Sequence, residues 1–169
     1  MKGDRSTKAE PRFIKRKNKI SGRFSARLTE MLESPAYRVL SHSAHRLLAR
    51  IEIELSHHGG NDNGSLPVTN EDFIAYGIHH NAIVPAEREV EALGFTRMKR
   101  GRAGNADHRQ PNKFFLTYIN SRSYPPTHDW RKIKTIEESE VIAKAARANK
   151  SPRVLRSCRR RRLNCLAWA

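Results

Sequence analysis

The clearest hydrophobic pattern in the chain lies between Ser41 and Gly59. Apolar residues recur there at the spacing that places them on one face of an α-helix. They are Ala44, Leu47, Leu48, Ile51 and Leu55. Ser41 is a favourable N-cap residue, and Gly59-Gly60 with the polar run after it indicates a loop. We therefore predict a long amphipathic helix over this range, whose polar face carries His45, Arg46, Arg50, Glu52 and Glu54.

Shorter helical segments are predicted on the N-terminal side of this helix. One apolar set has helical spacing and predicts a short helix that docks on the domain: Phe24, Leu28, Met31 and Leu32. Ser34 and Pro35 suit the N-cap and the first position of a further turn, which includes Tyr37 and Leu40.

A short strand and a short helix are expected over residues 66–76. Leu66-Pro67-Val68 is too short for a central strand, and Pro67 restricts it to a sheet edge. The run Thr69 to Asp72 resembles a capping box and so predicts the start of a helix over residues 70–75. Its expected buried residues are Phe73, Ile74 and Tyr76.

Gly77 permits a sharp reversal into a second helix that ends at Gly94, with Ile78 filling the core at the turn. Pro85 has no N–H to donate, which costs little stability only in the first turn of a helix. We therefore place the start of this helix near Asn81. One arc of the helix is apolar and should pack inward: Ala82, Ile83, Ala86, Val90 and Leu93. The opposite arc carries Asn81, Val84, Arg88 and Glu91.

Two strands joined by a basic loop are predicted next. Residues 95–100 alternate weakly, with Phe95, Arg97 and Lys99 on one side, and residues 113–119 are rich in aromatic and β-branched side chains. Helix, edge strand, short helix, turn, helix and hairpin is the order of a winged helix-turn-helix domain. The predicted fold class is therefore α+β, mainly α.

A further helix is predicted after the hairpin. Ser123 to Pro126 reads as a linker, and Trp130 and Ile133 are candidates to anchor the chain on the domain. Residues 135–138 resemble a capping box that opens a helix through about Ala148. Its apolar face is Val141, Ile142, Ala145 and Ala146. This face could dock on the same chain or support a dimer.

Four regions follow from these patterns. Residues 1–27 form a basic N-terminal arm, residues 28–120 the winged helix-turn-helix domain, residues 121–150 the linker and C-terminal helix, and residues 151–169 an Arg-rich tail. The arm could lie along phosphates or in a minor groove, or it could be a solvated disordered segment. The tail differs abruptly in composition from the domain, so we expect it to be a disordered and dispensable extension.

Net charge makes a polyanion the expected partner. The 169-residue chain has a formal net charge of +16 and a pI of about 10.6, so nucleic acid comes first among partners. Mean hydropathy is −0.74, and the sequence shows neither an apolar run of membrane-spanning length nor a secretory signal. We expect a soluble cytoplasmic protein.

Catalytic and metal-binding patterns are missing from the sequence. We find no P-loop, no Gly-x-Ser-x-Gly and no HExxH motif, so neither an enzyme nor a cofactor is expected. Cys158 and Cys165 do not have zinc-site spacing, and we interpret them as reduced thiols. The histidine pairs 42/45 and 57/58 lack further ligands at a usual spacing and are expected at the surface.

The second long helix is the predicted reader of duplex DNA. Asn pairs naturally with adenine and Arg with guanine, and the N-terminal residues of a recognition helix usually reach the bases. The candidate base-contacting residues are His80, Asn81, Val84 and Arg88. The candidate wing or backbone contacts are Arg97, Lys99, Arg100, Arg102, His108, Arg109 and Lys113. Glu87, Glu89 and Glu91 argue against this assignment unless they face away from the DNA or pair with arginines.

A family resemblance covers roughly residues 33–118. The stretches ESPAYRVLSHSAHRLLARIEIELSHHGGNDNGSLPVTNEDFIAYGIHHNAI and ALGFTRMKRGRAGNADHRQPNKFFLTYI resemble small winged-helix proteins that are common in alphaproteobacterial genomes and mobile elements. They are distantly similar to the winged-helix units of plasmid and phage replication initiators. The resemblance implies structural roles for Gly77, Ile78, Gly94, Gly101 and Gly104.

Three functions stay open at this point. The first is a sequence-selective DNA-binding protein, either a transcriptional regulator or an accessory replication factor, which could act as a homodimer. The second is a winged-helix module that binds a protein partner the sequence does not identify. The third is a nonspecific nucleic-acid binder that acts through its basic tails.

Overall fold

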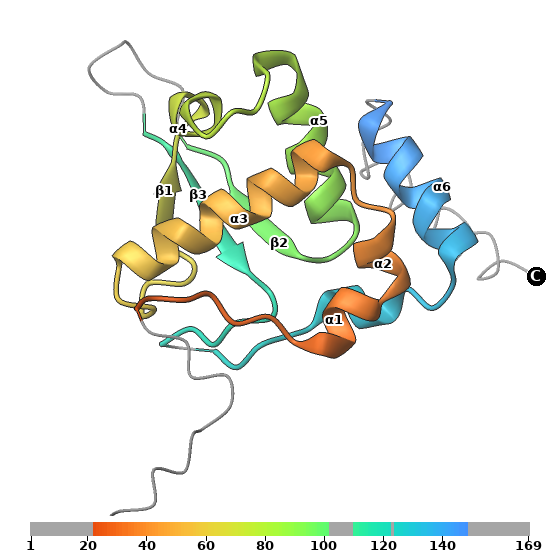
Figure 1. Cartoon of the computed structure of the whole chain (residues 1–169), viewed down its shortest axis with the longest axis horizontal. Coiled ribbons are helices and arrows are strands. Elements are labelled where there is room, and N and C mark those ends of the chain that lie inside the picture. The colour runs from red at the N-terminus through yellow and green to blue at the C-terminus, as the bar shows by residue number, and fades with distance from the viewer. Residues whose placement is uncertain (1–21, 102–109, 123, 149–169) are drawn as a thin grey trace, which may run out of the picture.

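A computed structural model of the protein describes residues 22–101, 110–122 and 124–148 (Figure 1). Most of the predicted basic arm and Arg-rich tail lies outside these residues, and so do both cysteines. The predicted loop residues Arg102, His108 and Arg109 also lie outside them.

Helices predominate in the described chain and are joined by one small sheet. The helices are α1 (Thr29–Glu33), α2 (Pro35–Arg38), α3 (His42–His57), α4 (Asn70–Ala75), α5 (His80–Ala92) and α6 (Ile136–Arg147), with a 3-10 turn, η2 (Asp129–Lys132). The strands are β1 (Leu66–Val68), β2 (Thr96–Lys99) and β3 (Asn112–Leu116). The α+β, mainly helical class predicted from the sequence is confirmed.

The sheet is antiparallel with the strand order β1-β3-β2. Leu66 lies opposite Phe114, and Thr96 lies opposite Leu116. β1 is an edge strand, as Pro67 predicted. Proline has no N–H to donate to a neighbouring strand, so it is found on strands that are paired on one side only.

The long helix α3 forms the centre of the core, and its predicted apolar stripe is confirmed. Ala44, Leu47, Leu48 and Ile51 are fully buried, and Leu55 is nearly so. The Ser41 side chain accepts a hydrogen bond from the N–H of Ala44, as expected of an N-cap. Glu52 lies beside this stripe and is buried as well, where a distant arginine and tyrosine contact it.

The short helix α4 begins with the predicted capping box. The Thr69 side chain accepts from the N–H of Asp72, and the Asp72 carboxylate accepts from the N–H of Thr69. Phe73 is buried, but Ile74 and Tyr76 are 45% and 39% exposed, so their predicted burial was wrong. A helix of six residues presents only one side to the core. The next core contact comes from Ile78, after the turn.

The boundaries of α5 and β2 agree with the glycine pattern. Gly77 and Gly94 have positive φ values of +87° and +82°, a conformation that glycine adopts without a Cβ penalty. α5 begins at His80, one residue before the predicted start. The N–H of Phe95 bonds to the carbonyl of Val90 and completes the C-cap. Phe95 is therefore buried before β2 begins. The alternation had predicted that Phe95 and Arg97 share one side, and that prediction was wrong.

The N-terminal docking helix is shorter and less buried than predicted. α1 is a single turn, and of its predicted apolar set only Met31 is buried, whereas Phe24, Leu28 and Leu32 are exposed. The Ser34 N-cap and Pro35 at the start of α2 are confirmed.

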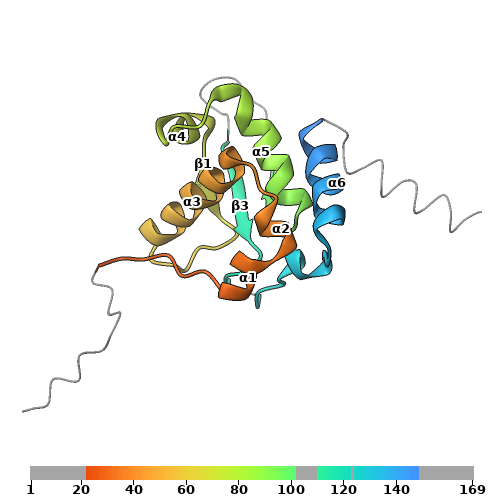
Figure 2. The ribbon, with the colours of Figure 1, turned by 45° about the vertical axis from the view of Figure 1, so that its right-hand side comes forward.

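The C-terminal helix α6 packs against α5 in the same chain (Figure 2). Trp130 and Ile133 are buried and anchor the preceding segment, as predicted. The face of α6 toward the domain is formed by Ser139, Ala143 and Ala146, so the prediction of a packed Val141 was wrong: this residue is 69% exposed. Thr135 caps the helix, but the Glu138 carboxylate accepts from the N–H of Lys134 instead of completing a box with Thr135.

None of the helices within residues 22–101, 110–122 and 124–148 combines the length and apolar character needed to cross a membrane.

Candidate nucleic-acid interface

The outer face of α5 carries the side chains that the sequence predicted. His80, Asn81, Val84 and Glu91 are exposed and Arg88 is half-buried. On the inner face Ile83, Ala86 and Val90 are at most 1% exposed. The helix therefore displays one polar stripe with a single exposed aliphatic side chain. Its start, α4 and the beginning of β3 lie at the same end of the molecule (Figure 1).

The start of α5 is capped by a histidine. The ring Nδ1 of His79 accepts from the N–H of Asn81 at 3.3 Å, and His80 Nδ1 lies 3.2 Å from Asn81 Oδ1. Pro85 lies inside the helix and has no N–H, so the Asn81 carbonyl lacks its usual intrahelical donor. The first turn consequently presents the side-chain amide of Asn81, and its main-chain carbonyl has no N–H of residue 85 to accept from.

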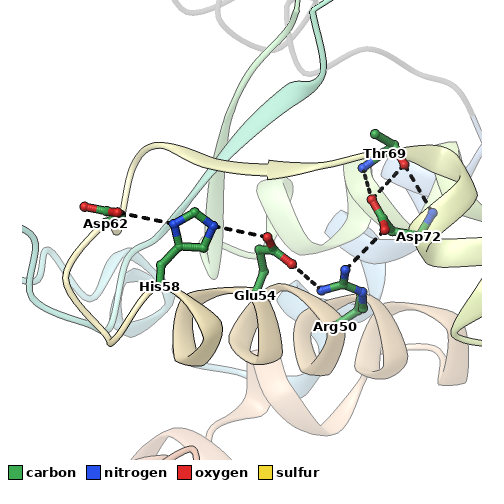
Figure 3. A network of polar contacts seen from close by, with 6 residues as sticks. All are labelled: Arg50, Glu54, His58, Asp62, Thr69 and Asp72. Atoms are coloured by element: carbon green, nitrogen blue, oxygen red, sulfur yellow. Dashed lines mark hydrogen bonds and ion pairs between the residues drawn. The ribbon is translucent and has the colours of Figure 1, made fainter.

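Polar contacts fix α4 and α5 onto α3. Arg50 on α3 donates to Glu54 at 2.8 Å and to Asp72 in the α4 cap at 3.2 Å (Figure 3). Hydrogen bonds from the Thr69 side chain and backbone, helped by the charge of Arg50, lower the pKa of Asp72. Arg46 donates to the carbonyl of Gly77 at 2.6 Å, at the turn between α4 and α5. Two arginines of α3 thus contact the cap of α4 and the turn between α4 and α5.

The same network continues beyond α3 into the loop that follows it. His58 Nε2 lies 3.2 Å from Glu54, and His58 Nδ1 lies 3.2 Å from Asp62 (Figure 3). The imidazole thus bridges two carboxylates, one on the helix and one in the loop, and it links the loop to the end of the helix.

The acidic residues of α5 divide between the core and the surface. Glu89 is fully buried and accepts from Ser41 N at 2.9 Å, Ser41 Oγ at 2.7 Å and Arg147 at 2.6 Å. Glu87 is 6% exposed beside Arg100 and Asn112, and burial raises the pKa of its carboxyl group. Among the described residues no hydrogen-bond partner reaches Glu87 Oε1. Only Glu91 presents its charge on the outer face of the helix.

The hairpin carries exposed cations that form no ion pair with a described carboxylate, although the buried Glu87 lies beside Arg100. Lys99, Arg100 and Lys113 are exposed, and no Asp or Glu of the described residues lies within 4.0 Å of their charged groups. Arg97 differs, since it donates to Asp129 at 2.7 Å and joins β2 to the segment before α6. Burial would raise the pKa of Asp129, but hydrogen bonds from Lys132 and Arg97 outweigh it and lower this pKa.

Sequence reasoning missed the roles of two residues that position the site. Asn63 appeared as one loop residue among several, yet it is buried and hydrogen-bonds the main chain of Leu116 and Ile119. Arg46 appeared as one position on the polar face of α3, and only its contact with Gly77 distinguishes it. Neither side chain has a local sequence signal, because the partners lie 31 or more positions away.

The folded unit is close to neutral. Its described residues hold 16 Lys and Arg against 14 Asp and Glu, while the remaining residues hold 17 against 3. Most of the net charge of +16 therefore belongs to the segments outside the described structure. Within the folded unit, a positive surface arises only where acidic side chains are buried or engaged elsewhere.

Among the residues that the structure describes, no three His, Cys, Asp or Glu side chains gather closely enough to hold a metal ion. Comparisons of the chain with protein-family models, with curated proteins and with solved structures gave no match.

Proposed function

We propose that the protein binds duplex DNA through a winged helix-turn-helix, with α5 as the helix that reads base edges. The observation that carries the proposal is the outer stripe of α5, where Asn81, Val84 and Arg88 are accessible while Glu87 and Glu89 are buried. The stripe can approach a polyanion because two of the three carboxylates of the helix do not face it.

The order of elements supports the winged-helix assignment. The order is α3-β1-α4-α5-β2-β3. This is a long helix, an edge strand, two helices joined by a short turn, and a two-stranded hairpin. The strand order β1-β3-β2 gives the first strand its pairing with the last. The family resemblance noted from the sequence would imply the same arrangement, and it stays a prediction.

The stripe has the chemistry for direct readout in the major groove. An Asn amide can bond adenine N6 and N7, an Arg guanidinium can bond guanine O6 and N7, and an apolar side chain can contact a thymine methyl. Asn81 and Arg88 are seven positions apart. That separation is about 10 Å along a helix axis, close to three base-pair steps.

Backbone contacts would come from the hairpin. Lys99, Arg100 and Lys113 are the described cations in a position to meet phosphates, and Arg102, His108 and Arg109 are predicted from the loop sequence. We leave Arg97 out of the proposed interface, because its guanidinium serves the fold through Asp129. A transcriptional regulator or an accessory replication factor, without catalytic activity, fits such a surface.

A second candidate is a protein-binding winged helix. It is favoured by Ile74 and Tyr76, two large apolar side chains that α4 and its C-terminal end leave exposed. Such a module would keep its partner when the α5 stripe is changed, and it would show little affinity for duplex DNA.

The test is a selection from a random duplex library with the full chain, followed by binding of the enriched duplex at near-physiological salt. An enriched motif that unlabelled random DNA does not compete away supports sequence-selective binding, and its symmetry reports the oligomeric state. Binding without enrichment would assign the affinity to nonspecific phosphate contacts, and no binding would favour the protein-binding module.

A further inference from the structure

Two lysines face each other across the hairpin. In the register of β2 and β3, Lys99 lies directly opposite Lys113, and both side chains are exposed. Like charges at directly opposed positions of a sheet destabilise it. A chain that keeps such a pair violates a local rule of sheet stability, and such violations are expected at functional sites.

The pair is held on one face of a closed stem. Side chains alternate along a strand, so the buried neighbour Phe114 keeps Lys113 on the outer side of the sheet, as half-buried Met98 does for Lys99. Just beyond the pair, the N–H of Gly101 donates to Asn112 Oδ1 at 3.1 Å. A Cβ on Gly101 would overlap the main chain of Gln110 and Pro111, so the two strands approach closely there. The strands are therefore held together on the loop side of the lysines.

Neither lysine forms an ion pair within the described part of the chain. The three strands contain no Asp or Glu, Arg100 directly follows Lys99, and the acid beside this end of the hairpin, Glu87, is buried against Arg100 and Asn112. Within the described residues neither lysine has a carboxylate within 4.0 Å. On the same outer face, the neighbouring cross-strand pair is Arg97 with Phe115, and there Asp129 balances the arginine. The chain therefore neutralises one cation of this face and leaves the opposed pair uncompensated.

We propose that Lys99 and Lys113 form a phosphate-binding pair, and that its ligand is a backbone phosphate of the nucleic acid bound by α5. The identity of the ligand rests on the proposed function, whereas the anion site itself rests on the pair. Two ammonium groups on adjacent strands can reach one anion from both sides. The anion also removes the repulsion between them.

Two opposite effects follow from this arrangement. Replacing either lysine with glutamine removes the repulsion, so the free protein becomes more stable. The same change removes a phosphate contact, so binding to every duplex weakens and depends less on salt. A lysine with a purely structural or incidental role would not combine these two effects.

The experiment uses the full chain with Lys99→Gln, Lys113→Gln, the double variant and the control Lys134→Gln. Lys134 is an exposed lysine that also has no carboxylate within 4.0 Å among the described residues, so the control makes the same charge change away from the hairpin. Urea unfolding gives stability, and duplex binding is measured over a salt series. We expect the double variant to unfold at higher urea and to lose about 0.9 from the magnitude of its log–log salt slope for each phosphate contact removed. The control should change neither quantity by as much.

A second arm tests the anion site without DNA. Inorganic phosphate, compared with chloride at equal ionic strength, should raise the thermal midpoint of the wild type more than that of the double variant. Equal shifts in the two proteins, or equal slope losses in the double variant and the Lys134→Gln control, would overturn the proposal. A phosphate shift without any duplex binding would instead reject DNA as the ligand, and with it the proposed function.

Discussion

Two regions of this protein differ in whether their charged side chains form ion pairs. Within α3 and α5, the buried carboxylates of Glu52 and Glu89 each bind an arginine from a distant part of the chain, Arg27 and Arg147 respectively. On the hairpin, Lys99 and Lys113 face each other without a carboxylate among the described residues. Where charges are paired and buried they join segments of the fold. On the hairpin they stay exposed, without an ion-pair partner among the described residues, and are accessible to an anionic ligand.

The Glu52 cluster is the stronger of the two buried sites. Glu52 is 4% exposed, accepts from Arg27 Nε at 2.8 Å, and also accepts from the Tyr118 hydroxyl. Burial alone would lower the pKa of Arg27, but the hydrogen bond and charge of Glu52 outweigh burial, so the net effect raises this pKa. Burial and the neighbouring carboxylate raise the pKa of Tyr118. Each group thus stays in the protonation state that the cluster requires.

The largest expected effect is the loss of this cluster. Glu52→Ala removes the carboxylate that Arg27 and the buried Tyr118 hydroxyl share, and we expect it to lower the free energy of unfolding by about 3–5 kcal/mol. Urea unfolding measures the change. Glu137→Ala, on the exposed side of α6, is the control and should change stability by less than about 0.5 kcal/mol. Similar losses in both variants would contradict a special role for the buried carboxylate.

A smaller loss of stability is expected at the second buried site. Arg147→Ala removes the charged partner of Glu89, which keeps its bonds to Ser41, so we expect a loss of about 1–3 kcal/mol. Hydrogen exchange should show the opening mainly in α6, since Arg147 joins that helix to α5. Faster exchange spread evenly over the domain would argue against α6 as a separately anchored element.

The outer face of α5 should respond in binding and not in stability. Asn81→Ala and Arg88→Ala should each weaken binding to the selected duplex by about 1–3 kcal/mol and relax its sequence preference. Arg97→Ala is the matched control, because it removes an arginine that is engaged with Asp129. Fluorescence anisotropy on selected and scrambled duplexes measures both affinities. Equal losses on the two duplexes would assign Asn81 and Arg88 to backbone contacts.

The smallest effect concerns Glu87, a buried acid beside the cationic hairpin. Burial raises the pKa of its carboxyl group above the unfolded value, so the ionised form weakens the fold. The stability gained in Glu87→Gln should therefore be small below about pH 4, near the ordinary pKa of Glu. It should grow as the pH rises through the raised pKa and then stay constant. Urea unfolding over a pH series measures this difference, and a gain that shrinks with rising pH would be the wrong sign.

Local signals in the sequence were sufficient for the main elements. The apolar stripe of α3, the Ser41 cap and the Thr69–Asp72 box depend on residues within a few positions of one another, and all are present in the structure. The outer stripe of α5 follows from the same periodicity, so the accessibility of Asn81 and Val84 was predictable.

Contacts between distant segments could not be derived in this way. Periodicity alone does not show which partners the carboxylates of Glu52 and Glu89 have, because Arg27 and Arg147 lie 25 and 58 positions away. The error over Val141 has a related cause. The small side chains of α6 allow more than one face to pack inward, and contacts with α5 and α2, distant in the sequence, determine which one does.

Asn63 has a consequence for the behaviour of the protein among copies of itself. β1 pairs with β3 only as far as Phe114, and beyond that point the Asn63 amide both donates to and accepts from the main chain of Leu116. One side chain thereby takes the place of a further strand residue. Exposed strand edges are templates for pairing with other chains and so for aggregation. The Asn63 amide covers the part of the central strand β3 that β1 does not reach.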